Sequence, residues 1–149
     1  MSESASNDVA DRPYFRRDQA DGISAPDLAR EDSYVDHIVH ARGKRTRFTS
    51  VSLDLERIRD FGECSYRLRR VEAEADGHAV IEHEILITSL RRTATTGEKG
   101  ERLKAVQALR YARLRKEGLV DWGFEIAGLE RKDVIAWAGR QIQRYFARV

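Results

Sequence analysis

Residues 48–52 read Phe-Thr-Ser-Val-Ser, preceded by Arg47 and followed by Leu53. Aromatic and β-branched residues alternate here with small polar ones, which is typical of a β-strand. Asp54 is a good N-cap residue and predicts a helix through Phe61 that ends at Gly62. A strand followed at once by a helix therefore organises the middle of the chain.

The segments on either side extend this pattern. Tyr14 and Phe15 open a short strand that the Asp21-Gly22 turn ends, and residues 64–71 alternate at period two as a strand does. A further strand is predicted at 118–126, and a strand or buried segment at 79–87. A short turn or loose helix is predicted at 24–30, helical turns at 33–39, a polar loop at 93–100, and helices at 101–116 and 132–146. The sequence thus predicts a compact α+β domain over residues 12–149, preceded by a polar tail, residues 1–11, that we expect to be disordered.

Charge is unevenly distributed along the chain. The net charge is +2, but residues 91–149 contain 14 Lys and Arg against 7 Asp and Glu, whereas the rest contains 13 against 18. A basic C-terminal half can attract nucleic acid, a phosphate-rich ligand or an acidic partner surface. The same arginines can equally form solvated helix faces.

Cysteine and histidine usage excludes several classes of site. Cys64 is the only cysteine, which excludes internal disulfides and zinc sites built on several thiolates. His37 and His40 lie three residues apart without the further ligands of a metal motif, so we expect no metal. The N-terminus has no apolar run, so we expect a cytoplasmic protein and no membrane partner; export would require a secretion machine that needs no cleaved signal.

Three short motifs carry candidate chemistry. Arg16 offers a planar guanidinium suited to pyrophosphate, and Ser50 offers a hydroxyl that can orient a carboxylate. Glu117 stands just before the apolar segment 119–122 and can stabilise a positive charge on a sugar. His37 titrates near neutrality and can orient or deprotonate an acceptor. Together these groups suit cleavage of the N-glycosidic bond of a molecule that carries a pyrophosphate, as NAD does.

In the order of these motifs the chain resembles the mono-ADP-ribosyltransferase toxins of the cholera and pertussis type. Their aromatic-Arg-x-Asp strand corresponds to residues 15–18, their Asp-His pair to residues 36–37, and their aromatic-x-Ser-Thr-Ser strand to residues 48–52. The resemblance covers roughly residues 13–137 and implies an ADP-ribosyltransferase-like fold with two small packed β-sheets and flanking helices. It also implies NAD as substrate, Glu117, His37 and Ser50 as catalytic residues, and a set of NAD-binding residues: Phe15, Arg16, Asp18, Phe48, Ser50 and Ser52.

Two residues depart from the family pattern. Val51 replaces the middle Thr of the Ser-Thr-Ser motif. Arg115 stands two residues before Glu117, where many members have Glu or Gln, and the resemblance implies that this position faces the acceptor. Because a positive Arg115 would repel a guanidinium, we expect the acceptor to be something other than arginine.

Several alternatives stay open at this point. Glu82 and Glu84 form a rival Glu-x-Glu pair for the catalytic carboxylate. The macromolecular acceptor is a protein or a nucleic acid, as expected for a bacterial effector or toxin, and if water accepts the ribose the protein is an NAD glycohydrolase. From another class, the chain is a non-catalytic basic domain that binds nucleic acid or regulates a partner.

Overall fold

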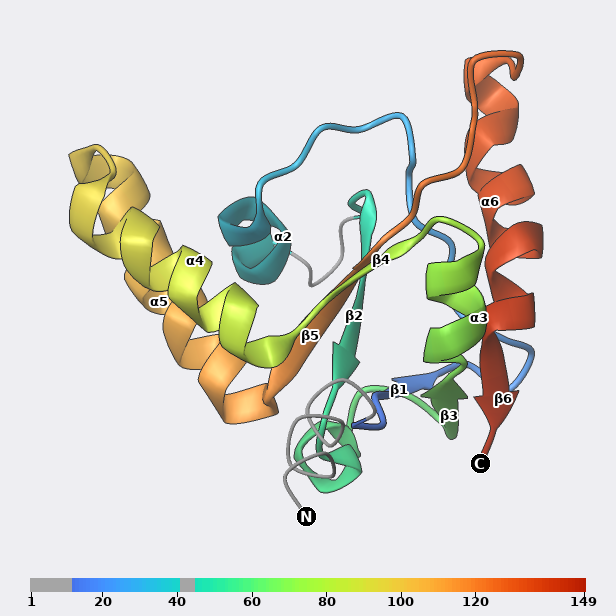
Figure 1. Ribbon diagram of the computed structural model, residues 1–149, viewed down its shortest axis with the longest axis horizontal. Helices are drawn as coiled ribbons and strands as arrows, with labels where there is room; N and C mark the ends of the chain where they lie inside the picture. Colours follow the sequence, from blue (N-terminus) through green and yellow to red (C-terminus); the bar gives the residue numbers. More distant parts are fainter. Residues whose placement is uncertain (1–11, 41–44) are drawn as a thin grey trace.

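Strand β2 (Phe48–Ser52) lies inside an antiparallel sheet, as Figure 1 shows. The computed structural model describes residues 12–40 and 45–149. In them the sheet has the order β4-β5-β2-β1-β3-β6. The other strands are β1 (Phe15–Asp18), β3 (Cys64–Leu68), β4 (Ala79–Ile81), β5 (Glu117–Asp121) and β6 (Phe146–Arg148).

Helices cover both faces of this sheet. One face packs against α2 (Tyr34–His40), α4 (His83–Thr96) and α5 (Lys99–Arg115), through a core that includes Phe48 and Leu119. The other packs against α3 (Arg70–Ala75) and α6 (Val134–Ile142), through a core that includes Val51 and Trp122. Three short 3-10 helices complete the fold: η1 (Leu55–Ile58), η2 (Arg131–Asp133) and η3 (Gln143–Tyr145). The expected α+β class is confirmed.

The centre of the sheet is its narrowest point. β1 and β2 are paired at a single position, Phe15 with Ser52, whereas β2 and β5 are paired along five residues. We expected two small packed sheets; the strands instead form one sheet, whose halves β4-β5-β2 and β1-β3-β6 meet at this pair. The backbone groups beyond the pair are therefore open to side chains, and this is where the motif residues lie.

Most predicted elements are present. The strands at 15–18, 48–52, 64–68 and 117–121, the helix at 34–40 and the helix at 99–115 lie close to their predicted positions. Ala105, Ala108 and Ala112 form the buried stripe of α5. Asp54 caps a helix by accepting a bond from the Glu56 amide, but that helix is a single 3-10 turn.

Several predicted elements differ from those observed. Residues 79–87 form a strand only to Ile81, and α4 begins at His83. Helices α4 and α5 together replace most of the expected loop at 93–100, because they pack as a hairpin. The expected C-terminal helix ends at Ile142, and β6 follows, paired with β3. The short turn or loose helix expected at 24–30 is a single turn at residues 28–29 in an otherwise extended segment, and the strand predicted at 64–71 ends at Leu68, because residues 70–75 are helical. The expected disordered tail lies outside the described residues.

Candidate active site

Glu117 is the buried centre of a polar cluster at the junction of the two sheet halves. It is the first residue of β5 and lies opposite Ser52 of β2, so its carboxylate reaches diagonally along β2 to Ser50. Ser50 donates its hydroxyl to Glu117 Oε2 at 2.8 Å. Glu117 is only 2% exposed, and its other oxygen, Oε1, has no hydrogen-bond partner among the residues that the structure describes. A buried acceptor without a donor is unusual and marks a place where a ligand group can bind.

His37 of α2 supports Ser50 from the far side. Its Nε2 lies 2.6 Å from Ser50 Oγ, and its Nδ1 contacts the hydroxyl of Thr46. Because Ser50 donates to Glu117, its oxygen must accept from His37, so Nε2 carries the proton and Nδ1 accepts from Thr46. The order of donors, Thr46 to His37 to Ser50 to Glu117, therefore points every hydrogen bond toward the carboxylate.

Burial determines the protonation states of His37 and Glu117 in this hydrogen-bonded cluster. It lowers the pKa of His37 from 6.5 to about 4, with a further contribution from nearby Arg16, so the imidazole is neutral at pH 7. Burial also raises the pKa of Glu117, against the opposing effects of the Ser50 hydrogen bond and of Arg115 and Arg16. A carboxylate held in a poorly hydrated position interacts strongly with any positive charge that develops beside it.

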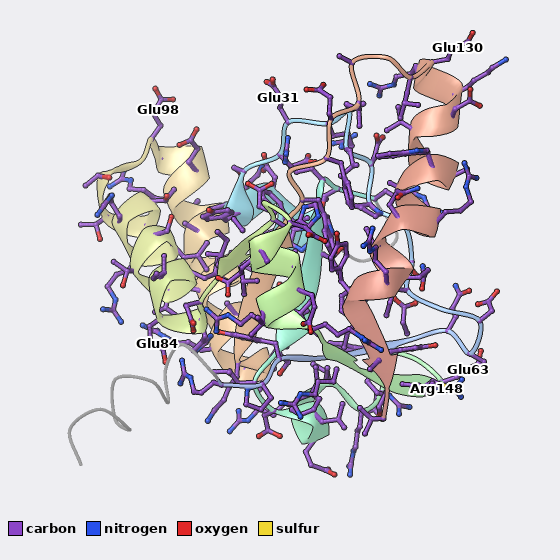
Figure 2. All side chains as sticks on the ribbon, turned by 45° about the vertical axis from the view of Figure 1, so that its right-hand side comes forward. Glu31, Glu63, Glu84, Glu98, Glu130 and Arg148 are labelled. Atoms are coloured by element: carbon purple, nitrogen blue, oxygen red, sulfur yellow. The ribbon has the colours of Figure 1, made fainter. Side chains whose placement is uncertain are left out.

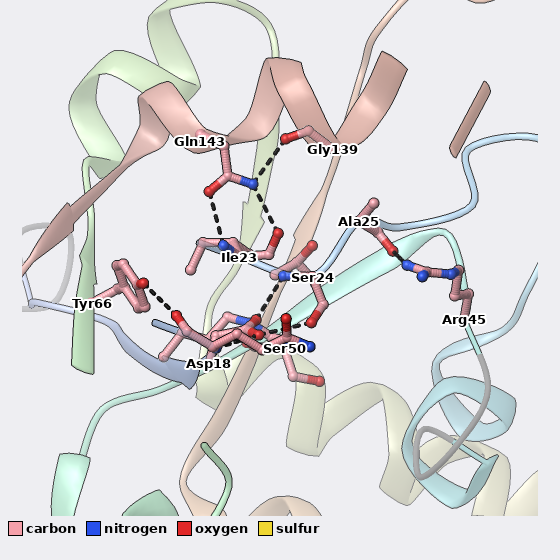
Figure 3. A network of polar contacts seen from close by, with 12 residues as sticks. Asp18, Ile23, Ser24, Ala25, Arg45, Ser50, Tyr66, Gly139 and Gln143 are labelled. Atoms are coloured by element: carbon pink, nitrogen blue, oxygen red, sulfur yellow. Dashed lines mark hydrogen bonds and ion pairs between the residues drawn. The ribbon is translucent and has the colours of Figure 1, made fainter. Parts of the chain in front are cut away.

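Arg16 of β1 bridges the open part of the sheet centre. Its Nε donates to Asp18 Oδ2 at 2.7 Å and its Nη1 to the Ser50 carbonyl at 2.8 Å. Asp18 is in turn held by the amide and hydroxyl of Ser24, as Figure 3 shows. The side chain of Gln143 bonds both backbone groups of Ile23 and so ties this segment to the end of α6. Arg16 is thus fixed on one edge and remains 22% exposed, which leaves its outer edge for a ligand.

Arg115 lies beside the carboxylate, at the end of α5. Its Nη1 is 3.9 Å from Glu117 Oε1, and its guanidinium lies 4.9 Å from the ring centre of Phe61 and 5.0 Å from that of Tyr111. These two rings fix the guanidinium by cation–π contact. With 26% of its side chain exposed, Arg115 forms, together with Arg16, the part of the cluster that reaches solvent.

The remaining expected site residues take supporting positions. Asp18, Phe48 and Ser52 are buried, whereas Phe15 is half-buried beside Arg16. Ser52 donates its hydroxyl to the carbonyl of Arg115 and accepts a hydrogen bond from the amide of Asp54, which links the turn after β2 to the end of α5 just before Glu117. Phe48 packs edge-on against His37. Their direct contact with NAD stays a prediction, but their contacts within the protein explain how the site keeps its shape.

The rival carboxylates lie in a different cluster. Glu82 accepts a hydrogen bond from Tyr14 at 3.0 Å and pairs with Arg70, and exposed Glu84 pairs with Arg12. Neither has a hydrogen bond or ion pair with Arg16, Ser50 or His37 in the part of the chain that the structure describes. The geometry therefore favours Glu117 as the carboxylate that acts with Ser50.

Three contributors to the site were not predicted. Thr46 precedes β2 and belongs to none of the three motifs, and Phe61 follows η1 in an irregular segment. Tyr111 stands four residues before Arg115 on α5, a spacing that places two side chains on one helix face and could have indicated their contact. These residues complete the site from segments that the motifs do not include.

Other kinds of site find little support in the described ranges. Residues 12–40 and 45–149 contain no group of three or more His, Cys, Asp or Glu side chains that could hold a metal ion. No described helix is long and apolar enough to cross a membrane. A cavity of about 520 Å³ lies between α2, α4 and α5, but its lining includes none of the clustered residues.

Comparison of the chain with models of known protein families, with curated proteins and with solved structures gives no match. The functional argument therefore depends on the geometry of the polar cluster.

Proposed function

We propose that this protein is a mono-ADP-ribosyltransferase, which cleaves NAD at the bond between nicotinamide and ribose and transfers ADP-ribose to a macromolecule. The observation that carries the proposal is the hydrogen bond between Ser50 and Glu117, with Arg16 bound to the carbonyl of the same serine. Three motifs that are far apart in the sequence contribute to this one cluster. Its composition is the one that the resemblance implies.

The chemistry follows from the charge of the cluster. When the bond from nicotinamide to ribose C1 breaks, its electron pair leaves with neutral nicotinamide, and positive charge appears on the sugar. Glu117 stabilises that charge by its own negative charge, and its unpartnered Oε1 can accept a hydrogen bond from a ribose hydroxyl. The acceptor atom then bonds to C1 and loses a proton, so the transfer involves no change of oxidation state.

His37 is better suited to positioning than to deprotonating an acceptor. It is buried, both ring nitrogens are engaged, and its lowered pKa makes it a weak base. Its neutral Nε2–H instead fixes the hydroxyl of Ser50, which in turn fixes Glu117. Arg16, with its outer edge free, is the group that we assign to the pyrophosphate.

Arg115 bears on the choice of acceptor. Because its positive charge lies next to Glu117, an incoming guanidinium would be repelled in a poorly hydrated site. We therefore expect ADP-ribose on a group other than the arginine side chain. Labelled NAD, a cell lysate and separate nucleic-acid fractions, followed by mass spectrometry of the products, test this; modification mainly of arginines would contradict it.

Release of nicotinamide from NAD by the purified protein is the direct test of the proposed function. Transfer to a macromolecule distinguishes a transferase from an NAD glycohydrolase, which the same cluster would support with water as acceptor. A second candidate is a non-catalytic domain, which the burial of Glu117 favours. If no nicotinamide is released at any NAD concentration up to the millimolar range, the non-catalytic candidate replaces our proposal.

A further inference from the structure

Helices α4 and α5 form a hairpin that concentrates the positive charge of the protein. We define the basic hairpin as residues 83–116, which project from the sheet on the left of Figure 1. It contains nine Lys and Arg against three Glu, whereas the rest of the chain has four more acidic than basic residues. Two of these three lie far apart in Figure 2: Glu84 is near the start of α4, and Glu98 is in the turn between α4 and α5. The hairpin is thus a cationic element on an otherwise acidic protein.

The cations of the basic hairpin differ from the others in their surroundings. Elsewhere most basic side chains have an acidic partner within 4 Å: Arg12, Arg16, Arg30, Arg47, Arg57, Arg59, Arg70, Arg131, Lys132 and Arg144. On the hairpin only Arg115 has one, among the residues that the structure describes. Its other cations are exposed. Exposed and uncompensated positive charge is the usual property of a surface that binds polyanions.

Four of these cations follow one side of α5. Lys99, Arg102, Arg110 and Arg113 are separated by three, eight and three residues, which places them on a common stripe at 100° per residue. At 1.5 Å rise per residue, the first and third lie about 16 Å apart along the axis. A line of cations of this kind can follow the phosphate backbone of a single strand over a short segment.

Apolar side chains accompany this stripe. Leu103, Val106 and Leu114 are 67%, 54% and 60% exposed on α5. Phe61, 53% exposed, continues the surface at the C-terminal end of the helix, next to Arg115. Single-stranded nucleic acid offers both phosphates for the cations and unstacked bases for the apolar groups, whereas a duplex keeps its bases stacked inside.

We infer that the basic hairpin binds single-stranded nucleic acid and that this strand is the acceptor of ADP-ribose. The second half of this inference rests on the proposed function. The direction of α5 supports it, because the helix ends at Arg115 and the chain turns through Lys116 directly into Glu117. A nucleic-acid strand bound along the stripe extends toward the candidate catalytic carboxylate. There a base can attack ribose C1 and lose a proton, or a phosphate oxygen can attack ribose C1 and lose its negative charge.

The binding test needs no NAD. Fluorescence anisotropy would measure the affinity of the full chain for 20-nucleotide oligo(dT) and oligo(U) and for a 20-base-pair duplex, over a range of salt concentrations. The variant Arg102→Gln/Arg110→Gln/Arg113→Gln should bind the single strands at least tenfold more weakly. Since each lost phosphate contact lowers the slope of log affinity against log salt by about 0.7, the slope should fall by about 2.

The matched control is Arg67→Gln/Arg69→Gln/Arg140→Gln. It removes the same charge from exposed arginines outside the hairpin that have no ion pair in the described structure, and it should bind like the wild type. Equal loss in both variants, tighter binding of the duplex, or a change of oligomeric state in the hairpin variant without loss of oligonucleotide binding would each overturn the inference.

The transfer test separates the two proposals. With labelled NAD and oligonucleotide, the wild type should label the strand, whereas the hairpin variant should lose this labelling but still release nicotinamide. Oligonucleotide binding without nicotinamide release would support the docking surface and contradict the proposed function. Nicotinamide release without labelling of any oligonucleotide would leave NAD cleavage standing and overturn the assignment of the acceptor.

Discussion

At the scale of single residues, Glu117 combines burial with an incomplete set of hydrogen bonds. Burial raises its pKa, and Oε1 has no donor among the described residues. Both features lower the stability of the folded protein at this position. Ser50, which His37 holds in place, gives a hydrogen bond only to Oε2, and Arg115 lies 3.9 Å from Oε1. Such an arrangement is costly for folding and is useful where positive charge must be stabilised.

Glu117→Gln should therefore abolish nearly all nicotinamide release while the fold is retained. The substitution keeps the size of the side chain but removes the charge that faces the sugar, and electrostatic contributions of this kind are about 3 kcal/mol, or roughly a hundredfold in rate. A nicotinamide assay with circular dichroism as fold control measures this. Glu84→Gln is the matched control, because Glu84 lies in the other cluster; loss of activity there alone would transfer the role to Glu84.

Arg16 and Arg17 are neighbours on β1 with different partners, and they allow an equally direct comparison. Arg16→Ala should weaken NAD binding by roughly tenfold to a hundredfold, because a charge-assisted contact contributes about 1.5–3 kcal/mol. Arg16→Lys should recover only part of the affinity, since an ammonium cannot replace a planar guanidinium. Arg17 binds Ser65 and the Gly62 carbonyl, so Arg17→Ala should leave NAD affinity unchanged. Titration calorimetry that shows equal affinity for both alanine variants would remove Arg16 from the site.

At the scale of secondary-structure elements, the approach of β5 to its neighbours depends on Gly118. A Cβ at this position would lie 2.7 Å from Tyr14 Cε1 and 2.9 Å from the Ile81 carbonyl oxygen. Gly118 directly follows Glu117 and pairs with Val51 of β2. A side chain here would force the strands apart at the position that carries the carboxylate of the candidate site.

Gly118→Ala should thus lower the free energy of unfolding by about 1–3 kcal/mol, which is typical of overpacking in a close-packed core. Gly100→Ala on α5 is the control: its Cβ meets nothing within 4 Å, and alanine favours the helix, so stability should stay constant or rise slightly. Urea denaturation compares the two. Equal stability of Gly118→Ala and wild type would show that β4 and β5 tolerate a wider separation than we describe.

The elements also show where prediction from sequence succeeds. The period-two alternation at 48–52 and 64–68 predicted strands correctly, because the local sequence pattern and the pairing within the sheet favour the same structure there. Residues 85–87, Ile-Leu-Ile, favour a strand locally, yet they form a helix, because Leu86 and Leu90 on one helix face become buried against α5. Tertiary packing decided this segment, and no local pattern could reveal it.

The site shows the same division. The order of the motifs indicated Arg16, His37, Ser50 and Glu117, which the structure brings into one cluster. Thr46 and Phe61 come from irregular segments, and their contribution depends on how β2 and η1 pack against α2 and α5. Motif residues are thus predictable from their chemistry, whereas their supporting contacts need the fold.

At the scale of the whole molecule, the site joins the two halves of the sheet. Ser50 and Glu117 belong to the half β4-β5-β2, and Arg16 belongs to the half β1-β3-β6. Each sheet face has its own apolar core, so the cluster is a polar link in the narrow centre between them. Titration of its buried groups should consequently change the stability of the entire domain.

Two of these groups act in opposite directions as the pH changes. The pKa of His37 is about 4 in the folded protein against 6.5 ordinarily, so the unfolded chain binds more protons in this range and stability falls as the pH drops from 6.5 toward 4. The pKa of Glu117 is raised above 4.5, so the folded protein binds more protons and stability falls as the pH rises above 4.5. In the wild type the two effects partly cancel.

Two single-residue variants separate the contributions of His37 and Glu117 to the pH dependence of stability. Glu117→Gln removes the cost of a buried charge, so it should be more stable than the wild type at pH 7 and lose this advantage at pH 4. His37→Gln should be less stable at pH 7, because it cannot bridge Thr46 and Ser50 equally well. It should also lose less stability than the wild type between pH 7 and pH 4, by up to about 3 kcal/mol, the free energy of a pKa difference of this size. Urea denaturation at pH 4, 5, 6 and 7 gives all three curves. If His37→Gln and the wild type have parallel curves, folding does not lower the pKa of His37, and the assignment of a neutral imidazole in the cluster is wrong.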